Sequence, residues 1–278
     1  ISRQTEQQGR VTANPLVKVE NLKVWFPSGR KKRGSHQRYI KAVDDVSFDI
    51  YKGETVGLVG ESGCGKTTLG RSLLRLIDPT AGTVYFEEQN LRHLSPVQLR
   101  RMRKNFQIIF QDPYSSLNPR LSVGSAIQEA MYIHGLGESS KNRKDLIINI
   151  LEKVNLSAGH YSRYPHEFSG GQRQRIGIAR ALALHPSFII CDESVSALDV
   201  SVQAQVLNLL NDLKEEFGFA ALFISHDLSV VRYISDRILV MYKGKIEEAG
   251  HAEVVYNAPQ SAYTKKLIAA IPRGILPS

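Results

Sequence analysis

Short apolar runs alternate along the chain with segments whose apolar residues repeat at helical spacing. The runs cover residues 56–59, 106–110, 188–191 and 219–224, and helical patterns follow them. This alternation predicts an open α/β sheet. Alternating segments at 16–26 and 39–43, and again at 237–241 and 245–249, predict two hairpins. The first hairpin has a charged tip at 30–34, and residues 122 to about 160 predict a helical insertion with Leu146, Ile150, Leu151 and Val154 on one face.

A glycine-rich stretch follows the first of these runs. Its sequence is Gly60-Glu61-Ser62-Gly63-Cys64-Gly65-Lys66-Thr67, and the helical pattern after it places Leu69, Leu73 and Leu76 on one face. Glycines leave no Cβ in the way, so backbone N–H groups can close around a phosphate at the positive end of the helix. Lys66 adds a positive charge, and the hydroxyl of Thr67 can bind Mg²⁺. The alternative is an ordinary glycine turn, which the flanking strand and helix disfavour.

Polar side chains follow the other apolar runs. Gln111 follows the second run, Asp192 and Glu193 the third, and His226 the fourth. Such positions face the ligand crevice of an open α/β sheet. The acidic pair suits Mg²⁺ and the activation of an attacking water, and the histidine suits a γ-phosphate contact. The alternatives are a surface acidic pair and a structural histidine.

Two further candidates come from other parts of the chain. Ser169-Gly170-Gly171-Gln172 precedes a helical pattern, so it predicts a second anion-binding turn. Phe26, with Trp25 as the second choice, could stack on a purine. The alternative is that both aromatic rings pack in the core or at a sheet edge.

Composition narrows the class of protein. The 278 residues can bury a sizeable core. No apolar run approaches the ~18 residues of a membrane span, and no signal-peptide pattern opens the chain, so we expect the cytoplasmic side of the membrane. Because the chain begins with Ile1, we also expect a segment upstream of it.

The net charge of +9 suits an anionic ligand, nucleic acid or a phospholipid surface, or reflects a solvated basic face. Two cysteines exclude a disulfide framework and a cysteine-ligated metal site.

Taken together, the motifs over residues 16–270 resemble those of ATP-binding cassette (ABC) ATPases. The order of the six motifs is specific, and other phosphate-loop ATPases lack the signature. Residues 60–67, with the adjacent Thr68, resemble the Walker A loop, Gln111 the Q-loop glutamine, 169–172 the signature, 189–193 Walker B, 196–199 the D-loop and His226 the switch histidine.

Within the family, the chain is most similar to the ATPase subunits of bacterial oligopeptide, dipeptide and nickel importers. That resemblance rests on residues 111–120, 166–168 and 257–267. The chain departs from the subfamily's C-terminal pattern at Ala258 and Ala262. It departs from the commoner family residues at Ser194 and Phe168, and neither of these two changes touches a phosphate-contacting group.

The resemblance implies an α/β fold, namely a phosphate-loop ABC ATPase with a RecA-like core, an antiparallel β subdomain and a helical subdomain. We expect residues 1–15 to be a tail or linker, 16–250 the ATPase domain and 251–278 a C-terminal tail. Within the domain, we expect the core at 16–112 and 182–250 and the helical subdomain at about 113–181.

ATP and Mg²⁺ are the implied cofactors. In the family, Ser169 and Gly171 would bind the γ-phosphate held by the other subunit's Lys66, which requires a dimer. Glu193 would be the general base, Asp192 and Gln111 would arrange Mg²⁺ and water, and His226 would hold the γ-phosphate. As a separate hypothesis, Cys64 is expected to be reactive because a helix N-terminus stabilises a thiolate.

The implied function is ATP-driven uptake of peptides or a similar small solute, at the cytoplasmic face of the inner (cell) membrane. The expected partners are two multi-span permease subunits, a second ABC ATPase subunit or an upstream ATPase half, and indirectly a solute-binding protein. Residues 112–122 would form the hinge at which the permease docks. The alternative is a soluble ABC ATPase acting on nucleic acid or ribosomes, which the importer-like segments disfavour. An export half-transporter separated from its membrane domain is a third possibility.

Overall fold

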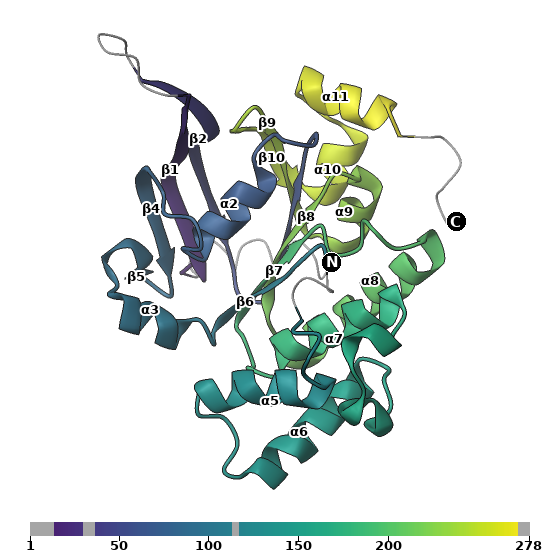
Figure 1. Cartoon of the computed structure of the whole chain (residues 1–278). Helices are drawn as coiled ribbons and strands as arrows, with labels where there is room; N and C mark the ends of the chain where they lie inside the picture. Colours follow the sequence, from purple (N-terminus) through teal and green to yellow (C-terminus); the bar gives the residue numbers. More distant parts are fainter. Residues whose placement is uncertain (1–13, 30–36, 113–116, 272–278) are drawn as a thin grey trace.

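The structure, a computed structural model, describes residues 14–29, 37–112 and 117–271. The predicted hairpin tip and part of the predicted hinge, residues 113–116, lie outside these ranges. Figure 1 shows that the described elements form two sheets and a group of helices, which confirms the α/β fold expected from the sequence. The helices are α2 Lys66–Leu73, α3 Pro96–Met102, α5 Val123–Ile133, α6 Ser140–Lys153, α7 Gly170–Leu182, α8 Val200–Phe217, α9 Leu228–Ile234, α10 Ala252–Asn257 and α11 Ala262–Ala269, with short 3₁₀ turns at Leu91–His93, Ala158–Ser162 and Pro165–Glu167.

In the described residues, the larger sheet has six strands in the order β10-β9-β3-β8-β7-β6. Their bounds are β3 Thr55–Val59, β6 Phe106–Ile109, β7 Phe188–Asp192, β8 Ala220–Ser225, β9 Arg237–Tyr242 and β10 Lys245–His251. The pairs from β9 to β6 are parallel, whereas β10 pairs antiparallel with β9 as the predicted hairpin. Every residue of β3, β7 and β8 is buried, which explains why these strands read as unbroken apolar runs.

Helices cover both faces of this sheet. A Cβ added to Gly70 of α2 would lie 2.8 Å from Cδ1 of Ile224 on β8, so α2 packs closely on one face. A Cβ added to Gly57 of β3 would lie 2.1 Å from Cγ1 of Val231 on α9, so α9 packs on the other. The two glycines therefore let one helix approach each face of the sheet closely.

The smaller sheet is antiparallel and has the order β2-β1-β4-β5. Its strands are β1 Val17–Ser28, β2 Arg38–Ile50, β4 Ala81–Phe86 and β5 Gln89–Asn90. The predicted hairpin is confirmed as β1 paired with β2, from Val17 opposite Ile50 to Ser28 opposite Arg38. Because α2 contacts β1 and β2 as well as β7 and β8, it lies between the two sheets.

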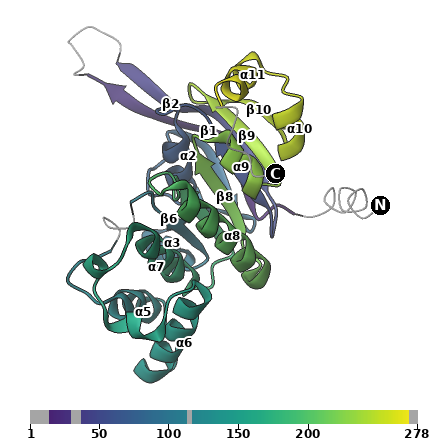
Figure 2. The same cartoon turned by 90° about the vertical axis from the view of Figure 1, so that its right-hand side faces the viewer.

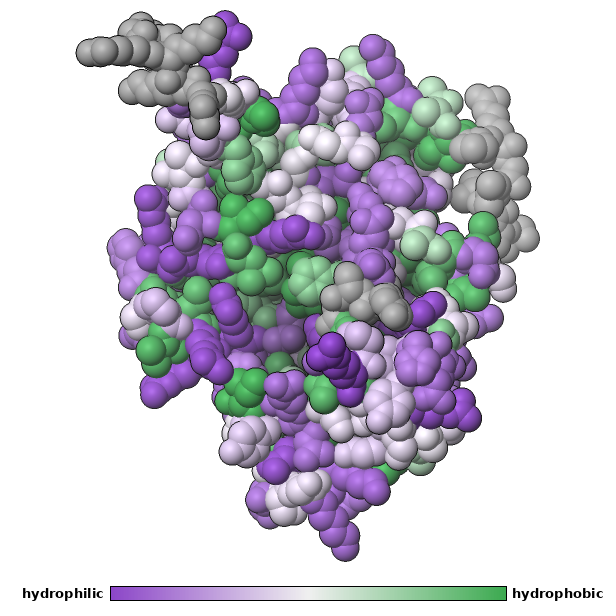
Figure 3. Space-filling model, in the orientation of Figure 1, coloured by the Kyte–Doolittle hydropathy of each residue, from purple (hydrophilic) through white to green (hydrophobic). Residues whose placement is uncertain are grey.

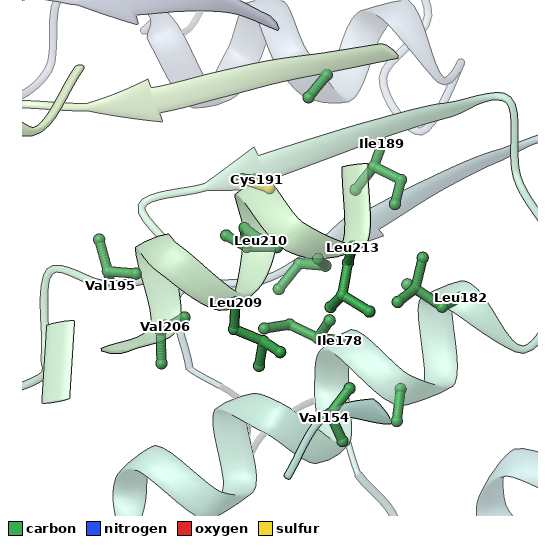
Figure 4. Packing of buried hydrophobic residues seen from close by; sticks show 14 of the residues in the cluster. Val154, Ile178, Leu182, Ile189, Cys191, Val195, Val206, Leu209, Leu210 and Leu213 are labelled. Carbon is green, nitrogen blue, oxygen red and sulfur yellow. The ribbon is translucent and has the colours of Figure 1, made fainter. Parts of the chain in front are cut away.

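The predicted helical insertion is confirmed as α5 and α6, which pack on each other and on α7. Figure 4 shows that α8 and α7 share one apolar core with strand β7: Ile178 and Leu182 lie beside Leu209 and Leu213, below Ile189. The core is therefore continuous between the helices and one face of the large sheet.

Two leucines that were predicted to lie on the buried face of a helix are exposed instead. Leu76 is 47% exposed because α2 ends at Leu73 and the chain leaves the helical path. Leu146 is 39% exposed, and Ile147 takes its place on the buried face of α6. Residues 147, 150, 151 and 154 then follow the i, i+3, i+4, i+7 rule, to which position 146 does not belong.

Residues 252–271 fold back as α10 and α11 beside β9 and β10. Figure 2 shows these two helices at the end of the molecule opposite α5 and α6. Side chains of α11, among them Tyr263 and Leu267, pack against the larger apolar cluster. Within the described ranges, each helix is too short or too polar to span a bilayer. The face seen in Figure 3 mixes hydrophilic and hydrophobic side chains, without a broad apolar band.

Candidate functional site

The candidate site lies at the carboxyl edge of the large sheet. Strands β3, β8, β7 and β6 are parallel neighbours, so their carboxyl ends meet at the same edge. Residues 60–67, His226 and Glu193 directly follow β3, β8 and β7, Asp192 is the last residue of β7, and Gln111 comes shortly after β6. The topology therefore gathers four segments that the sequence analysis selected separately, as expected for the ligand crevice of an open α/β sheet.

The glycine-rich loop is held between two strands. A Cβ added to Gly60 would lie 2.1 Å from the carbonyl oxygen of Met241, at the end of β9, and one added to Gly65 would lie 2.0 Å from that of Ala42 on β2. Gly65 also has φ +113, and Gly63 has φ +79 with open space around it. Only glycine fits these positions without strain, so neighbouring strands fix the shape of the loop.

Lys66 directs its ammonium group into the loop. Nζ donates to the carbonyl oxygens of Gly60 at 2.8 Å and of Glu61 at 3.0 Å, and it lies 3.9 Å from Oε1 of Glu193. The side chain is buried, so this charge is concentrated inside the loop. Cys64 is buried in the same turn, and Thr68 is half-buried on the first turn of α2. Glu61 and Ser62 are exposed.

Thr67 and Asp192 meet across two elements. The Thr67 hydroxyl donates to Oδ1 of Asp192 at 2.9 Å, and Nε of Arg71 lies 3.8 Å from Oδ2. Burial raises the pKa of Asp192, although the bond from Thr67 and the charge of Arg71 oppose that rise. A hydroxyl beside a buried carboxylate is a donor set that fits Mg²⁺, since the metal would stabilise the ionised form.

Glu193 lies at the centre of the polar groups. Its backbone has φ +50, an uncommon conformation for a residue with a side chain, and its N–H donates to the carbonyl oxygen of Ile224 at 3.0 Å. Oε1 lies 4.0 Å from Nδ1 of His226, whose side chain is exposed, and 3.9 Å from Nζ of Lys66. One carboxylate, directly after β7, thus lies between two nitrogen groups, one from the start of α2 and one from the residue after β8.

Gln111 is connected to Glu193 through Ser196. Nε2 of Gln111 donates to Oγ of Ser196 at 3.2 Å, and Oγ donates to the carbonyl oxygen of Glu193 at 2.9 Å. The sequence indicated Ser196 only as part of a family motif, and the bridge that it makes was missed. Arg71 was also missed, although its position one turn after Thr67 on the same helix was a usable signal.

The turn at residues 169–172 forms a capping box at the start of α7. Oγ of Ser169 accepts from the N–H of Gln172 at 3.3 Å, and Oε1 of Gln172 accepts from the N–H of Ser169 at 3.1 Å. A Cβ added to Gly171 would lie 2.5 Å from Cγ1 of Val202, whereas Gly170 has only Leu198 at 3.8 Å. Among the described residues, no recorded hydrogen bond joins this turn to residues 60–67 of the same chain.

The two aromatic candidates differ in their surroundings. The Trp25 indole N–H donates to Asp44 at 3.2 Å, and its ring contacts Tyr39 and lies 4.4 Å from Nζ of Lys41. Phe26 is 39% exposed on the neighbouring position of β1. Of the two rings, Phe26 is therefore the one with surface to offer to a base.

The expectation of a reactive thiol at Cys64 is wrong. Cys64 is 8% exposed, and burial raises the pKa of its thiol, although the charge of Lys66 opposes that rise. Cys191, inside β7, is also buried, and burial raises its pKa to about 12. The helix N-terminus does not outweigh desolvation here, so the thiolate is disfavoured at both positions.

Comparisons with known proteins place this geometry in one family. Residues 43–196 match the family described as ABC transporter. The chain is 54% identical over 258 residues to the oligopeptide transport ATP-binding protein OppF of Bacillus subtilis, across 92% of this chain and 82% of that protein. It is 51% identical over 269 residues to the glutathione import ATP-binding protein GsiA of Escherichia coli O6:H1, across 96% of this chain and 43% of that protein. The fold matches a dimeric post-hydrolysis state of the ATP-binding cassette MJ0796 bound to ADP and Pi, with a TM-score of 0.75 and 28% identity over 85% of this chain and 98% of that one.

Proposed function

The chain belongs to the ABC transporter family and is an ATPase of that family, and from this premise we propose that it drives the uptake of peptides or a similar small solute through a membrane permease. The observation that carries the proposal is the 54% identity to an oligopeptide transport ATP-binding protein across 92% of the chain. The alternative function, on nucleic acid or ribosomes, has no support among the relatives named above.

For nucleotide binding, we propose the loop at residues 60–67 with Thr68. Its backbone N–H groups at the start of α2 would surround the phosphates, and Lys66 would turn from the loop carbonyls to a phosphate oxygen. Phe26 would stack on the base. Thr67, Asp192 and Gln111 would hold Mg²⁺, which supplies charge neutralisation on the β- and γ-phosphates when bound.

For hydrolysis, we propose Glu193 as the general base for the attacking water. Nζ of Lys66 and Nδ1 of His226 lie 3.9 and 4.0 Å from Oε1 of Glu193, slightly too far for a direct hydrogen bond. The same two groups are suited to hold the γ-phosphate, so the carboxylate is located where phosphate and water would meet. Gln111 would be coupled to the position of Glu193 through its hydrogen bond to Ser196.

We further propose that the site is completed by a second ATPase subunit. The turn at 169–172 (Ser169, Gly170, Gly171 and Gln172) would bind the γ-phosphate held by the partner. Among the described residues, the recorded side-chain hydrogen bonds of Ser169 and Gln172 stay within the capping box, and none of them reaches residues 60–67 of the same chain. The solved relative with ADP and Pi is itself a dimer. In this proposal, the core at 16–112 and 182–250 carries the nucleotide, and the helical subdomain at about 113–181 carries the turn that reaches the partner.

The remaining partners follow from the same proposal. The chain would bind two multi-span permease subunits at the cytoplasmic face of the inner (cell) membrane, with residues 112–122 next to Gln111 as the docking hinge. A solute-binding protein would act on the permease from the other side. Loss of the γ-phosphate would open the ATPase pair and change the docking surface.

The test uses a strain that lacks the chromosomal copy, complemented with tagged wild type, Glu193→Gln or Glu216→Gln. Glu216, on α8, is half exposed and pairs with Lys153, so it serves as a matched control. All three forms should co-purify with a permease from detergent-solubilised membranes, while Glu193→Gln alone abolishes uptake of labelled peptides. Recovery of ribosomal or DNA-repair proteins without a permease would contradict the proposal.

A further inference from the structure

The phosphate loop is contacted by a side chain from the far end of the sequence. The hydroxyl oxygen of Tyr263, on α11, accepts a hydrogen bond from the N–H of Glu61 at 3.0 Å. The Tyr263 ring packs against Tyr242, the last residue of β9, with centroids 4.2 Å apart and ring planes tilted by 33°. Burial raises the pKa of Tyr263, so the group stays a neutral hydroxyl at physiological pH. The contact thus joins the first turn of the loop to the C-terminal helices.

Glu61 is held on both sides of its backbone. Its N–H donates to Tyr263, and its carbonyl oxygen accepts from Lys66 at 3.0 Å. The bond from Lys66 belongs to the same ammonium group that would move to a phosphate oxygen in the proposed function. Once Lys66 turns away, two recorded hydrogen bonds to the Glu61 backbone remain among the described residues: the bond to the Tyr263 hydroxyl and a bond from the N–H of Cys64 at 3.2 Å. The bond from Cys64 lies within the loop, whereas the bond to Tyr263 ties the loop to α11.

The position of Tyr263 is itself fixed by the neighbouring strand. The carboxylate of Glu248, on β10, accepts from the N–H of Gln260 at 2.8 Å and from that of Ser261 at 3.0 Å. Ser261 in turn caps α11, because its hydroxyl accepts from the N–H of Tyr263 at 3.1 Å. Burial opposes ionisation of Glu248, but the two N–H donors together with Thr264 and the charge of Lys265 outweigh it, and the pKa of Glu248 is lowered. The bonds to the Glu248 carboxylate therefore hold the start of α11 against β10, and the Ser261 cap fixes the first turn of the helix.

We infer that Tyr263 is a positioning residue for the phosphate loop, and that residues 252–271 strap the loop into the shape that accepts a nucleotide. The inference rests on the proposed nucleotide site. Tyr263 touches no reacting atom, so its loss should weaken nucleotide binding and leave the chemical step unchanged. A single net hydrogen bond corresponds to a weakening of about two- to tenfold, for ADP as well as for ATP.

The experiment compares the full-length wild type with Tyr263→Phe, which removes the hydroxyl and keeps the ring packed against Tyr242. The matched control is Tyr256→Phe on α10, where the ring lies against Arg232 and the structure records no contact with residues 60–67. ADP and ATP dissociation constants are measured by calorimetry, the nucleotide-free unfolding midpoint by circular dichroism, and exchange of the Glu61 amide hydrogen by NMR. Glu248→Gln, which weakens the anchor of α11, is the second variant should Tyr263→Phe fail to fold.

We expect Tyr263→Phe to raise both dissociation constants two- to tenfold and to speed Glu61 amide exchange, with the unfolding midpoint unchanged. Tyr256→Phe should match the wild type. Unaltered nucleotide affinity and unaltered Glu61 exchange in Tyr263→Phe would overturn the inference. A wild type that binds no nucleotide would overturn the proposed function instead, and Glu61 exchange, which needs no nucleotide, would still decide whether the strap exists.

Discussion

Substituting Gly65 with alanine tests whether strand β2 fixes the phosphate loop. Gly65 is the residue before α2 and has φ +113. A Cβ there would lie 2.0 Å from the carbonyl oxygen of Ala42 and 2.9 Å from Cε of Met241. The methionine end can move aside, but the β2 backbone is bonded to β1 and cannot shift without disturbing the hairpin. Two costs therefore combine at this position, one conformational and one steric.

Two other glycines separate these costs. Gly63→Ala meets open space at φ +79, so it carries the conformational cost alone, about 1–2 kcal/mol. Gly65→Ala adds the steric cost, about 1–3 kcal/mol by comparison with overpacked cores, for a total of about 2–5 kcal/mol. Gly177→Ala, inside α7 with open space around it, should stabilise the protein by about 0.5–1 kcal/mol.

Urea unfolding of the nucleotide-free proteins at 25 °C measures all four free energies of unfolding by linear extrapolation. The expected order of stability is Gly177→Ala, wild type, Gly63→Ala and then Gly65→Ala. Because both loop variants place alanine at a positive φ, the difference between them reports mainly the close approach of Ala42. If Gly65→Ala is as stable as Gly63→Ala within about 0.5 kcal/mol, β2 does not constrain the loop.

Two further predictions concern the metal and the thiols. Thr67→Ala and Asp192→Asn should each weaken Mg²⁺-dependent ATP binding about tenfold or more, and leave binding in EDTA nearly unchanged; an equal loss with and without Mg²⁺, measured by calorimetry, would refute the ligand assignment. Because burial raises the pKa of both thiols, Cys64 and Cys191 hold little thiolate at pH 7.5. Iodoacetamide should therefore label the native protein at least about tenfold more slowly than the urea-unfolded chain, and more quickly only as the pH rises toward the raised pKa values; rapid labelling of native Cys64, found by peptide mass spectrometry, would contradict this reasoning.

The strands that carry the site were predictable because they are buried on both faces. An unbroken apolar run at 188–191 or 219–224 has few other interpretations, and the polar residue after it then lies at the strand's carboxyl end. The edge strand β2 was predicted over 39–43 and extends to Ile50. Its second half alternates buried and exposed residues with polar side chains outside, a pattern weaker than a continuous run.

Features that depend on distant contacts were not predictable. A pattern places Cys64 at a helix start, but only the folded chain shows that it is buried. Tyr263 lies 202 positions from Glu61, so the sequence offers no sign that they bond. The prediction that Leu146 lies on the buried face of α6 was wrong for a local reason. A buried face shifted by one residue, to Ile147, fits the same apolar segment nearly as well. Long-range packing decides such positions, and periodicity does not.

The central claim is that Glu193, directly after β7, activates water against a nucleotide held by the loop after β3. Its most direct test loads ATP onto the transporter purified with wild type or with Glu193→Gln, then removes free nucleotide and identifies what stays bound. The account predicts intact ATP and a closed ATPase pair with Glu193→Gln, against ADP and turnover with the wild type. Equal turnover in the two proteins would contradict it.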